Sequence, residues 1–299
     1  MKTFLLSALS IPTRHQLLVS AVGPRPIALA STTNLQGQVN LSPFSFFNIF
    51  SSNPPIAVFS VSRRGYDSSV KDTFLNLKEV PEVAINMVNY SMGQQISLAS
   101  NEYPQGVNEF EKAGFTMKNC DIIRPPYVGE APVVLECKVS DIITLGDQGA
   151  SGNLILCRIL KMHVREEFLD KDDNLDSSQL DLIGRMGANW YCRAFGDALF
   201  EITKPSRELA IGIDRLPQHI KTSIILNGND LGQLGSQPNV PSDDSWTQIR
   251  DLQSVKEIRD SDLSQENKRN DIHQKIKALI DSRAIEEALA LAFWADEFL

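Results

Sequence analysis

Three short segments carry the residue types that a planar ligand with a polar rim requires. The first, Ser42–Asn48, reads SPFSFFN and places phenylalanine rings between hydroxyl groups and one amide. The second, Ser60–Thr73, contains two arginines and a lysine, and the third, Gly184–Arg193, again mixes small, amide, aromatic and basic residues. Aromatic faces beside a few polar groups are typical of small-molecule pockets. We therefore expect these segments to contribute to one site.

The second segment has the chemistry of a phosphate site. Arg63 and Arg64 can form forked, charge-assisted hydrogen bonds to phosphate oxygens, and Lys71 adds a compact positive charge. Thr73 lies at the start of a predicted helix, where free backbone N–H groups favour an anion. The alternative is a solvated loop, because adjacent charged side chains usually lie on the surface.

The first segment suits a tricyclic ring such as that of a flavin. Such a ring needs flat apolar contact, and its polar edges need N–H and amide partners. Phe46, Phe47 and Asn48 can supply both. The alternative is a core strand. Because alternate side chains of a strand face opposite ways, some of these phenylalanines, together with Phe44, must be buried.

Short apolar runs predict the elements that position these segments. The predicted strands are 27–33, 39–42, 56–61, 82–88, 131–143 and 153–164, and the predicted helices are 73–79, 91–99 and 106–113. Strands joined by short loops, with helices inserted rather than alternating regularly, are typical of an antiparallel sheet. The pattern therefore predicts a mainly β fold, a β-barrel with inserted helices, and not a doubly wound sheet.

The character of the sequence changes after residue 205, so we predict two domains, 1–205 and 206–299. An apolar stripe predicts helix over 271–299. Asp271 and Gln274 form a candidate capping box, and Ser282 is a candidate start for a second helix. We expect the second region to be a mostly helical extension that packs on the barrel or stabilises a dimer.

Composition excludes several classes of protein. The formal net charge is −8, which argues against a nucleic-acid partner, because such proteins usually need a basic face. No apolar run approaches the ~20 residues needed to span a membrane. The N-terminal MKTFLLSALS has an apolar core that is shorter than the hydrophobic region of a typical signal peptide, which has about 7–15 residues. We therefore expect a cytoplasmic protein.

The cysteines and histidines indicate no metal centre. Cys120, Cys137, Cys157 and Cys192 form no CxxC pair, and we predict reduced, mostly buried thiols. Zinc is the alternative, because Cys157 and His163 lie at the same parity of one predicted strand, but no second pair completes a site. A lone histidine such as His163 is more often packed or exposed than catalytic.

Several motifs occur in order along the first two thirds of the chain. They are PRPIALAST, NLSPFSFFN, SSNPPIAVFSVSRR, KDTFLNLK, GVNEFEKAGF, PVVLECKV, GNLILCRI and GRMGANWYCR. Together, over about residues 10–204, they resemble the flavin reductase-like, FMN-binding split-barrel family of the flavoredoxin type. The resemblance implies a Greek-key split barrel and a homodimer, with FMN bound at or near the dimer interface.

The resemblance also implies the residues that hold the cofactor. It places Ser45, Phe46, Phe47 and Asn48 along the flavin ring and ribityl chain, Ser60, Ser62, Arg63 and Arg64 near the ribityl chain and phosphate, Lys71, Asp72 and Thr73 at the phosphate, and Asn189 and Tyr191 near the flavin of either subunit. Relatives often carry two glycines before that asparagine. Here Gly187-Ala188 stands instead, and the added methyl group narrows the space above the ring.

The function that the resemblance implies is an FMN-dependent oxidoreductase. NADH or NADPH passes hydride to flavin N5, and the electrons continue to a small-molecule or protein acceptor. No catalytic side chain is assigned, because the cofactor supplies the chemistry. No GxGxxG motif follows a predicted strand, so the nicotinamide must stack directly over the flavin.

Two alternatives to this function remain open. One is a non-catalytic FMN-binding sensor or interaction module, in which the second region makes contact with a partner. The other is a related split-barrel activity that uses a different cofactor, such as a pyridoxal-type phosphate. The absorption spectrum of the extracted cofactor distinguishes the second alternative from the FMN-dependent oxidoreductase and from the FMN-binding module.

Overall fold

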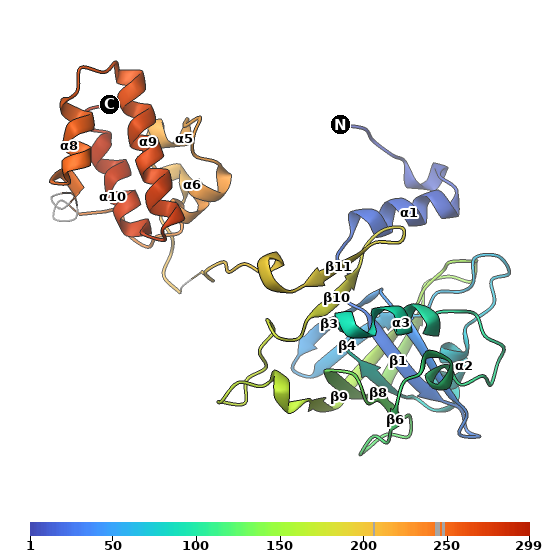
Figure 1. Ribbon diagram of the computed structural model, residues 1–299. Coiled ribbons are helices and arrows are strands. Elements are labelled where there is room, and N and C mark those ends of the chain that lie inside the picture. The colour runs from blue at the N-terminus through green and yellow to red at the C-terminus, as the bar shows by residue number, and fades with distance from the viewer. Residues whose placement is uncertain (206, 243–245, 247–248) are drawn as a thin grey trace. The chain divides into compact units, whose positions relative to one another are not determined.

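The computed structural model describes residues 1–205, 207–242, 246 and 249–299. Residue 206, the first of the predicted second domain, is therefore not described. The chain divides into two compact units, Met1–Phe200 and Glu201–Leu299 (Figure 1). Within the described residues, no helix is long and apolar enough to cross a membrane.

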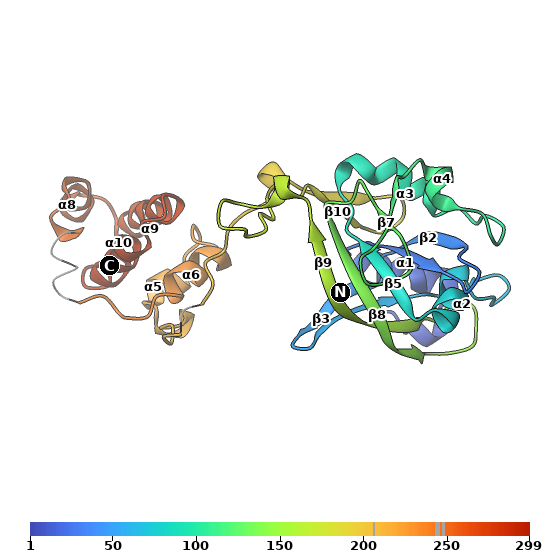
Figure 2. The same cartoon turned by 90° about the horizontal axis from the view of Figure 1, so that it is seen from below.

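An antiparallel sheet of seven strands forms the first unit, in the spatial order β2-β1-β5-β8-β9-β4-β3 (Figure 2). The strands are β1 (Ala28–Thr33), β2 (Val39–Phe44), β3 (Phe47–Ser52), β4 (Pro55–Ser60), β5 (Glu82–Asn86), β8 (Val133–Thr144) and β9 (Asn153–Val164). Strands β1 and β2, β3 and β4, and β8 and β9 pair as hairpins. Alternation along β1 sends Ala28 and Ala30 to one core and Leu29 to another, so both faces of this strand are buried.

The two edges of this sheet meet at a seam. Strands β2 and β3 lie at opposite ends of the strand order, yet only Ser45 and Phe46 separate them in the chain. Three Cα–Cα steps span at most about 11 Å, so the sheet must curl until its edges are neighbours. The backbone N–H of Ser60 donates to Phe46 O at 2.8 Å and fixes the seam on the β4 side.

Helices cover the sheet. They are α2 (Asp72–Glu79), α3 (Gly93–Ala99) and α4 (Glu109–Ala113), and a further helix, α1 (Ile11–Ala21), precedes β1 and stands off the sheet (Figure 1). Phe74 and Leu77 of α2 join the core formed by residues such as Phe59 and Leu135. Side chains of α3 and α4 pack in a second core on the other face of β1. Gly114 ends α4 with φ +70°, a left-handed conformation that glycine adopts without strain.

Two short antiparallel pairs complete this unit. Strands β6 (Met117–Lys118) and β7 (Tyr127–Val128) form one of them. Strands β10 (Leu182–Arg185) and β11 (Tyr191–Ala194) form a hairpin that lies near α1. The backbones of Arg25 and Arg185 exchange two hydrogen bonds, of 3.0 and 2.8 Å, which attach this hairpin to the segment before β1.

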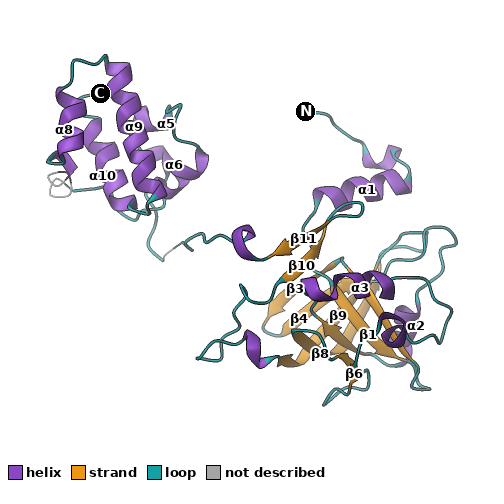
Figure 3. Ribbon diagram, viewed as in Figure 1, coloured by secondary structure: helices purple, strands orange, loops and turns teal. Residues whose placement is uncertain are grey.

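The second unit is helical and has its own core. Its helices include α5 (Gln218–Lys221), α6 (Gly228–Gly235), α8 (Gln253–Asp260), α9 (Gln265–Asp281) and α10 (Ile285–Ala295). The chain as a whole therefore mixes helices and strands (Figure 3), and the prediction of a mainly β protein describes only its first unit. The helical extension predicted for the second region is present, and α6 begins at Gly228, where asparagine- and glycine-rich sequence indicated a turn.

Two predicted helix starts in this unit are wrong. Asp271 and Gln274 lie inside α9, whose N-cap is Ser264, with its hydroxyl accepting from Asn267 N at 3.3 Å. Ser282 is the C-cap of α9, and α10 begins after Ala284. The polar first turns of α9 carry no apolar stripe, so periodicity located the middle of the helix and not its end.

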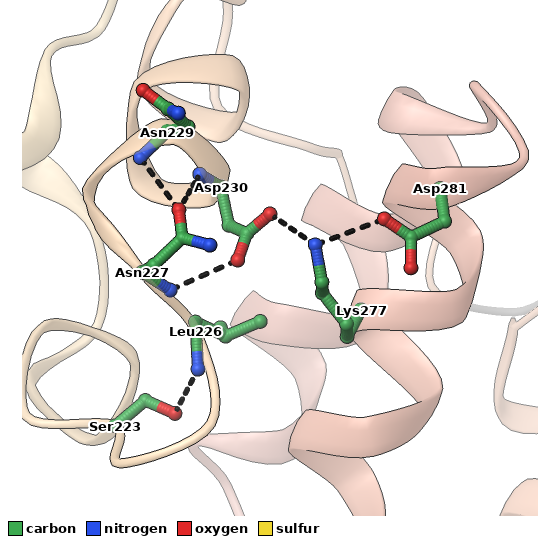
Figure 4. Close-up of polar contacts among 7 residues, drawn as sticks. All are labelled: Ser223, Leu226, Asn227, Asn229, Asp230, Lys277 and Asp281. Atoms are coloured by element: carbon green, nitrogen blue, oxygen red, sulfur yellow. Dashed lines mark hydrogen bonds and ion pairs between the residues drawn. The ribbon is translucent and has the colours of Figure 1, made fainter.

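A buried carboxylate joins α6 to α9 (Figure 4). The Asn227 side chain accepts from the N–H groups of Asn229 and Asp230, and Asp230 accepts from Asn227 N at 2.9 Å, which forms a capping box. The other oxygen of Asp230 lies 2.8 Å from Lys277 Nζ. Lys277 also pairs with the exposed Asp281 at 2.9 Å, so one lysine of α9 anchors the start of α6.

Candidate functional site

A cavity of about 400 Å³ opens at the seam of the barrel. Its walls come from α1, the end of β2 and the seam, the segment between β4 and α2, and the β10–β11 hairpin. The lining residues are His15, Gln16, Val19, Arg25, Pro43, Phe44, Ser45, Phe46, Ser60, Ser62, Lys71, Arg185, Met186 and Ala188. This volume lies in the usual range for small-molecule sites, about 300–1,000 Å³.

Aromatic side chains at the seam form one wall. Phe44 is buried, and its ring centroid lies 5.3 Å from that of Phe59 in the barrel core. Phe46 is 43% exposed, and its ring meets the edge of the His15 ring at 6.3 Å. Ser45 lies between the two phenylalanines. The wall therefore offers flat apolar area with a hydroxyl group at its centre.

Lys71 marks one cationic end of the cavity. It is the N-cap of α2, and its ammonium group lies 5.5 Å from the Phe44 ring centroid. Burial lowers the pKa of Lys71, and the charge of Arg64 lowers it further. The hydroxyls of Ser60 and Ser62 line the same cavity. A cation, two hydroxyls and the first N–H groups of a helix are a donor set suited to phosphate.

Close packing preserves the position of Ser60. A Cβ atom on Gly152 would lie 2.6 Å from the Ser60 hydroxyl oxygen, a distance that side chains do not tolerate. Gly152 therefore lets the β8–β9 connection approach the site. By contrast, Thr73 is buried away from the cavity, where its hydroxyl accepts from Asn40 Nδ2 at 2.9 Å.

The guanidinium groups of Arg63 and Arg64 are engaged elsewhere. Arg63 Nη1 donates to Ser68 O at 2.9 Å, and Arg64 Nη1 donates to Val70 O at 2.9 Å. Arg64 Nε also lies 3.5 Å from a Glu102 carboxylate oxygen. The two arginines thus hold together the loop that precedes Lys71, and neither lines the cavity. Arg63 Nε is buried and has no hydrogen-bond partner among the described residues.

Arg25 forms a second cationic end and ties three parts of the site together. It is buried and donates to Val19 O and Val22 O at the end of α1, the latter at 2.8 Å. It also donates to Met186 O at 3.1 Å and to Ser45 Oγ at 3.4 Å. Burial lowers the pKa of Arg25, and the neighbouring charge of Arg185 lowers it further. Arg25 positions α1, the seam and the hairpin against one another.

The β10–β11 hairpin closes the cavity with Arg185, Met186 and Ala188. The Arg185 guanidinium lies 4.6 Å from the Tyr191 ring centroid, and its Nη1 donates to Trp190 O at 2.9 Å. Ala188 has φ +48°, a left-handed conformation that glycine adopts more readily. Ala188 lines the cavity, and its place above a bound ring stays a prediction.

The structure brings together only part of the set predicted from sequence. Ser45, Phe46, Ser60, Ser62 and Lys71 line the cavity, whereas Phe47, Asn48, Arg63, Arg64, Asp72, Thr73, Asn189 and Tyr191 do not. Phe47 lies in the barrel core, and Asn48 accepts a hydrogen bond from its own neighbour, Ile49 N. Tyr191 is 41% exposed and supports Arg185 from outside the cavity.

Sequence reasoning placed the third segment at the site but did not single out its Arg185 and Met186, and it missed the residues that α1 contributes. His15, Gln16 and Val19 lie on a helix with no clear apolar face, so nothing in its pattern points to a site. Arg25 stands between two prolines in the motif PRP, and a cation in an apolar, proline-fixed segment was the available signal.

A separate cluster joins Asp121, Glu136 and His163, whose ligand-type atoms lie within 4.8 Å of one another. Glu136 is fully buried and accepts from Asp121 N at 2.8 Å, from Ile122 N at 2.9 Å and from His163 Nε2. Burial alone would raise the pKa of Glu136, but these hydrogen bonds outweigh it and lower the pKa. Lys161 pairs with Asp121, so a cation is already present, and the cluster fits an ion-pair network.

The buried cysteines offer no reactive thiolate. Cys137 and Cys157 are fully buried in the barrel core. Burial raises the pKa of Cys137 to about 12 and that of Cys120 to about 12. These groups remain protonated thiols at neutral pH, so the seam cavity is the better candidate site.

Comparison with known proteins gives a consistent result. The family described as flavin reductase like domain matches residues 22–179. An uncharacterized protein of Aquifex aeolicus is 34% identical over 190 residues, which cover 64% of this chain and 94% of that protein. The second unit lies outside the matched family segment.

Two solved structures of named proteins resemble the chain. The 2-nitrobenzoate 2-nitroreductase of Pseudomonas fluorescens is 28% identical, with a TM-score of 0.62, over 71% of this chain and 100% of that one. Component B of nitrilotriacetate monooxygenase from Bacillus cereus is 27% identical, also with a TM-score of 0.62, over 68% and 98%.

Proposed function

Because this chain belongs to the flavin reductase-like domain family, we propose that it is a flavoprotein that binds FMN in the cavity at the seam of the barrel. The proposed activity is that of an oxidoreductase that takes electrons from NADH or NADPH and passes them to an acceptor. The proposal rests on one observation above all. A single cavity combines a phosphate-type donor set around Lys71 with an aromatic wall formed by Phe44 and Phe46.

The residues present fit FMN. Lys71, Ser60 and Ser62, with the first N–H groups of α2, would hold the phosphate. The face of Phe46 would contact the ring, and Met186 and Ala188 of the hairpin would line the space above it. A cavity of about 400 Å³ accommodates a group of this size. When bound, FMN supplies the hydride and electron chemistry.

The role of the chain is to bind, orient and shield. Apolar groups at the seam limit the access of water, and Arg25 holds the walls in register through its backbone contacts. Among the described lining residues none is a carboxylic acid, so no acid–base pair stands ready for proton transfer. This composition suits direct transfer between a donor and a flavin, which needs position more than side-chain chemistry.

We also propose a homodimer with the cofactor near its interface. Large apolar side chains are exposed around the seam and the hairpin, among them Phe50 at 70% and Trp190 at 75%. Phe50 lies on β3, an edge strand of the sheet. Exposed apolar groups beside an unpaired strand edge are a common basis for association. A second copy that covers them would also narrow the mouth of the cavity.

Two measurements test the proposed function. The cofactor extracted from purified protein should show the absorption spectrum of FMN, and a pyridoxal-type spectrum would contradict the assignment. Under anaerobic conditions, NADH or NADPH should then bleach the visible flavin band. If neither donor bleaches it while FMN remains bound, the protein is a flavin-binding module and not a reductase.

A further inference from the structure

The seam cavity has more positive charge than one cofactor phosphate requires. Its lining includes Arg25, Lys71 and Arg185, and among the described lining residues none is acidic. In the described part of the chain, no carboxylate lies within 4.0 Å of any of these three cations. Arg25 is buried and Lys71 and Arg185 are half-buried, so the cavity lining as a whole favours anions.

The cations form two separate groups. Lys71 lies over the ring of Phe44, beside Ser60, Ser62 and the start of α2. Arg25 lies 6.0 Å from the ring of Phe46, on the other side of Ser45, and its backbone is paired with that of Arg185. FMN carries one phosphate, and the Lys71 group has the hydroxyl and helix donors that a phosphate prefers. The arginine group is then left for a different anion.

Of the two arginines, only Arg185 has donors to offer a ligand. Arg25 already donates to three backbone carbonyls and one hydroxyl. Among the described residues, the Arg185 side chain makes one hydrogen bond, from Nη1 to Trp190 O, and no ion pair. Its guanidinium rests on the Tyr191 ring, which fixes the plane of the group while leaving an edge for forked hydrogen bonds.

The surroundings of Arg185 suggest the shape of the ligand. Phe46 and His15 contribute rings, and Met186 and Ala188 contribute apolar surface, all lining the same cavity. A guanidinium edge next to flat apolar groups matches a planar molecule that carries a carboxylate. We propose that Arg185 is the centre of an anion subsite that binds the carboxylate of a small aromatic acid, and that this acid is the class of second substrate. The assignment rests on the proposed function.

Calorimetric titration of the full-length protein with benzoate and with benzamide, its neutral analogue, tests the subsite. Benzoate should bind at least about tenfold more tightly than benzamide. Arg185→Gln should weaken the binding of benzoate about 10- to 100-fold, the range expected for charge-assisted hydrogen bonds. It should leave the binding of benzamide unchanged. Arg185→Lys should recover part of the loss. Arg124→Gln, which removes an exposed charge outside the cavity, should have no effect.

Several outcomes would overturn the inference. They are equal affinity for benzoate and benzamide, no binding of either, or an Arg185→Gln protein that binds benzoate normally. If Arg185→Gln instead weakens the binding of FMN, the arginine binds the cofactor. If it raises the KM for NADH alone, the arginine serves the donor's phosphates. Because calorimetry detects benzoate whether or not flavin is reduced, failure of the reductase activity is recorded separately from failure of the subsite.

Discussion

Lys71 shows how a residue's position decides its chemistry. It sits at the N-cap of α2, and it lines the cavity, whereas the next two residues of the helix do not. Arg63 and Arg64 are stronger phosphate ligands by type, but their side chains bind backbone carbonyls of their own loop. The sequence predicted the loop that reaches the cavity, whereas local hydrogen bonding, which composition does not reveal, engages its arginines and leaves Lys71 on the lining.

Replacement of Lys71 therefore tests the phosphate end. Lys71→Gln should weaken FMN binding by about 1.5–3 kcal/mol, because a charge-assisted hydrogen bond is lost. Titration of the apoprotein with FMN, followed by flavin fluorescence, measures the change. Lys78→Gln, in the last turn of the same helix, is the matched control and should bind FMN normally. A normal Lys71→Gln protein, with loss of binding in an Arg63→Ala/Arg64→Ala double variant, would move the phosphate to the loop.

At the scale of elements, the helices of the second unit contain a buried chain of hydrogen bonds. Ser223 Oγ lies 2.9 Å from His273 Nδ1, His273 Nε2 lies 3.0 Å from His219 Nδ1, and His219 Nε2 lies 2.9 Å from Ala292 O. The carbonyl can only accept, so His219 Nε2 carries a proton. When both histidines are neutral, this fixes each following donor: His273 Nε2 donates to His219 Nδ1, and Ser223 Oγ donates to His273 Nδ1.

The hydrogen bonds between these two histidines predict that the second unit loses stability in acid. Burial, then the charges of His219 and Arg269, lower the pKa of His273 to about 4, and burial also lowers the pKa of His219 despite Asp296 at 4.0 Å. Below pH 6.5 the unfolded histidines bind protons that the folded ones do not, so stability falls from about pH 6.5 to pH 4. For His273, the difference between the pKa values of the unfolded and folded states corresponds to about 3 kcal/mol of folding stability.

Denaturant unfolding between pH 7.5 and 4.5, followed by fluorescence of Trp294, measures this loss. His273→Leu should reduce the dependence of stability on pH, although it also removes a hydrogen bond and lowers stability at every pH. His15→Gln changes an exposed histidine of the first unit and should leave the pH profile as it is. A wild-type profile that is flat across this range would contradict the neutral pair.

Lys277 offers a second comparison, between a buried and an exposed partner. Asp230→Ala removes the capping box of α6 and the buried partner of Lys277, so we expect a loss of about 2–4 kcal/mol in the free energy of unfolding. Asp281→Ala removes only an exposed i,i+4 pair and should cost less than about 0.5 kcal/mol. Thermal unfolding of both variants measures the difference. Equal losses would show that the capping box contributes little.

The limits of prediction are clearest among the elements. Continuous apolar runs located most strands, and β9 (Asn153–Val164) agrees to the residue. Strand β3 was missed because four of its six residues are exposed, so it shows neither an apolar run nor a clean alternation. Its place depends on pairing with β4, a contact outside its own sequence. The contribution of α1 to the site was missed for the same reason, since α1 reaches the cavity only through tertiary packing.

For the whole molecule, the two units predict separable folding. Each has its own core, and the matched family segment ends at residue 179, within the first unit. A fragment of residues 1–200 should therefore fold and bind FMN with an affinity close to that of the full chain. Circular dichroism, flavin titration and sedimentation of the fragment check this. A fragment that folds but is monomeric, beside a dimeric full chain, would show that the second unit builds the dimer.

The seam has a consequence for the motions of the barrel. Strands β2 and β3 share no ladder of hydrogen bonds, so the two edges are joined only by Ser45, Phe46 and the side chains around the cavity. A ligand bound there bridges both edges. Ligand binding and closure of the barrel are then one coupled equilibrium, and amide hydrogens of β2 and β3 should exchange with solvent more slowly when the cavity is filled. Bound cofactor would therefore stabilise the closed form of the barrel that binds it.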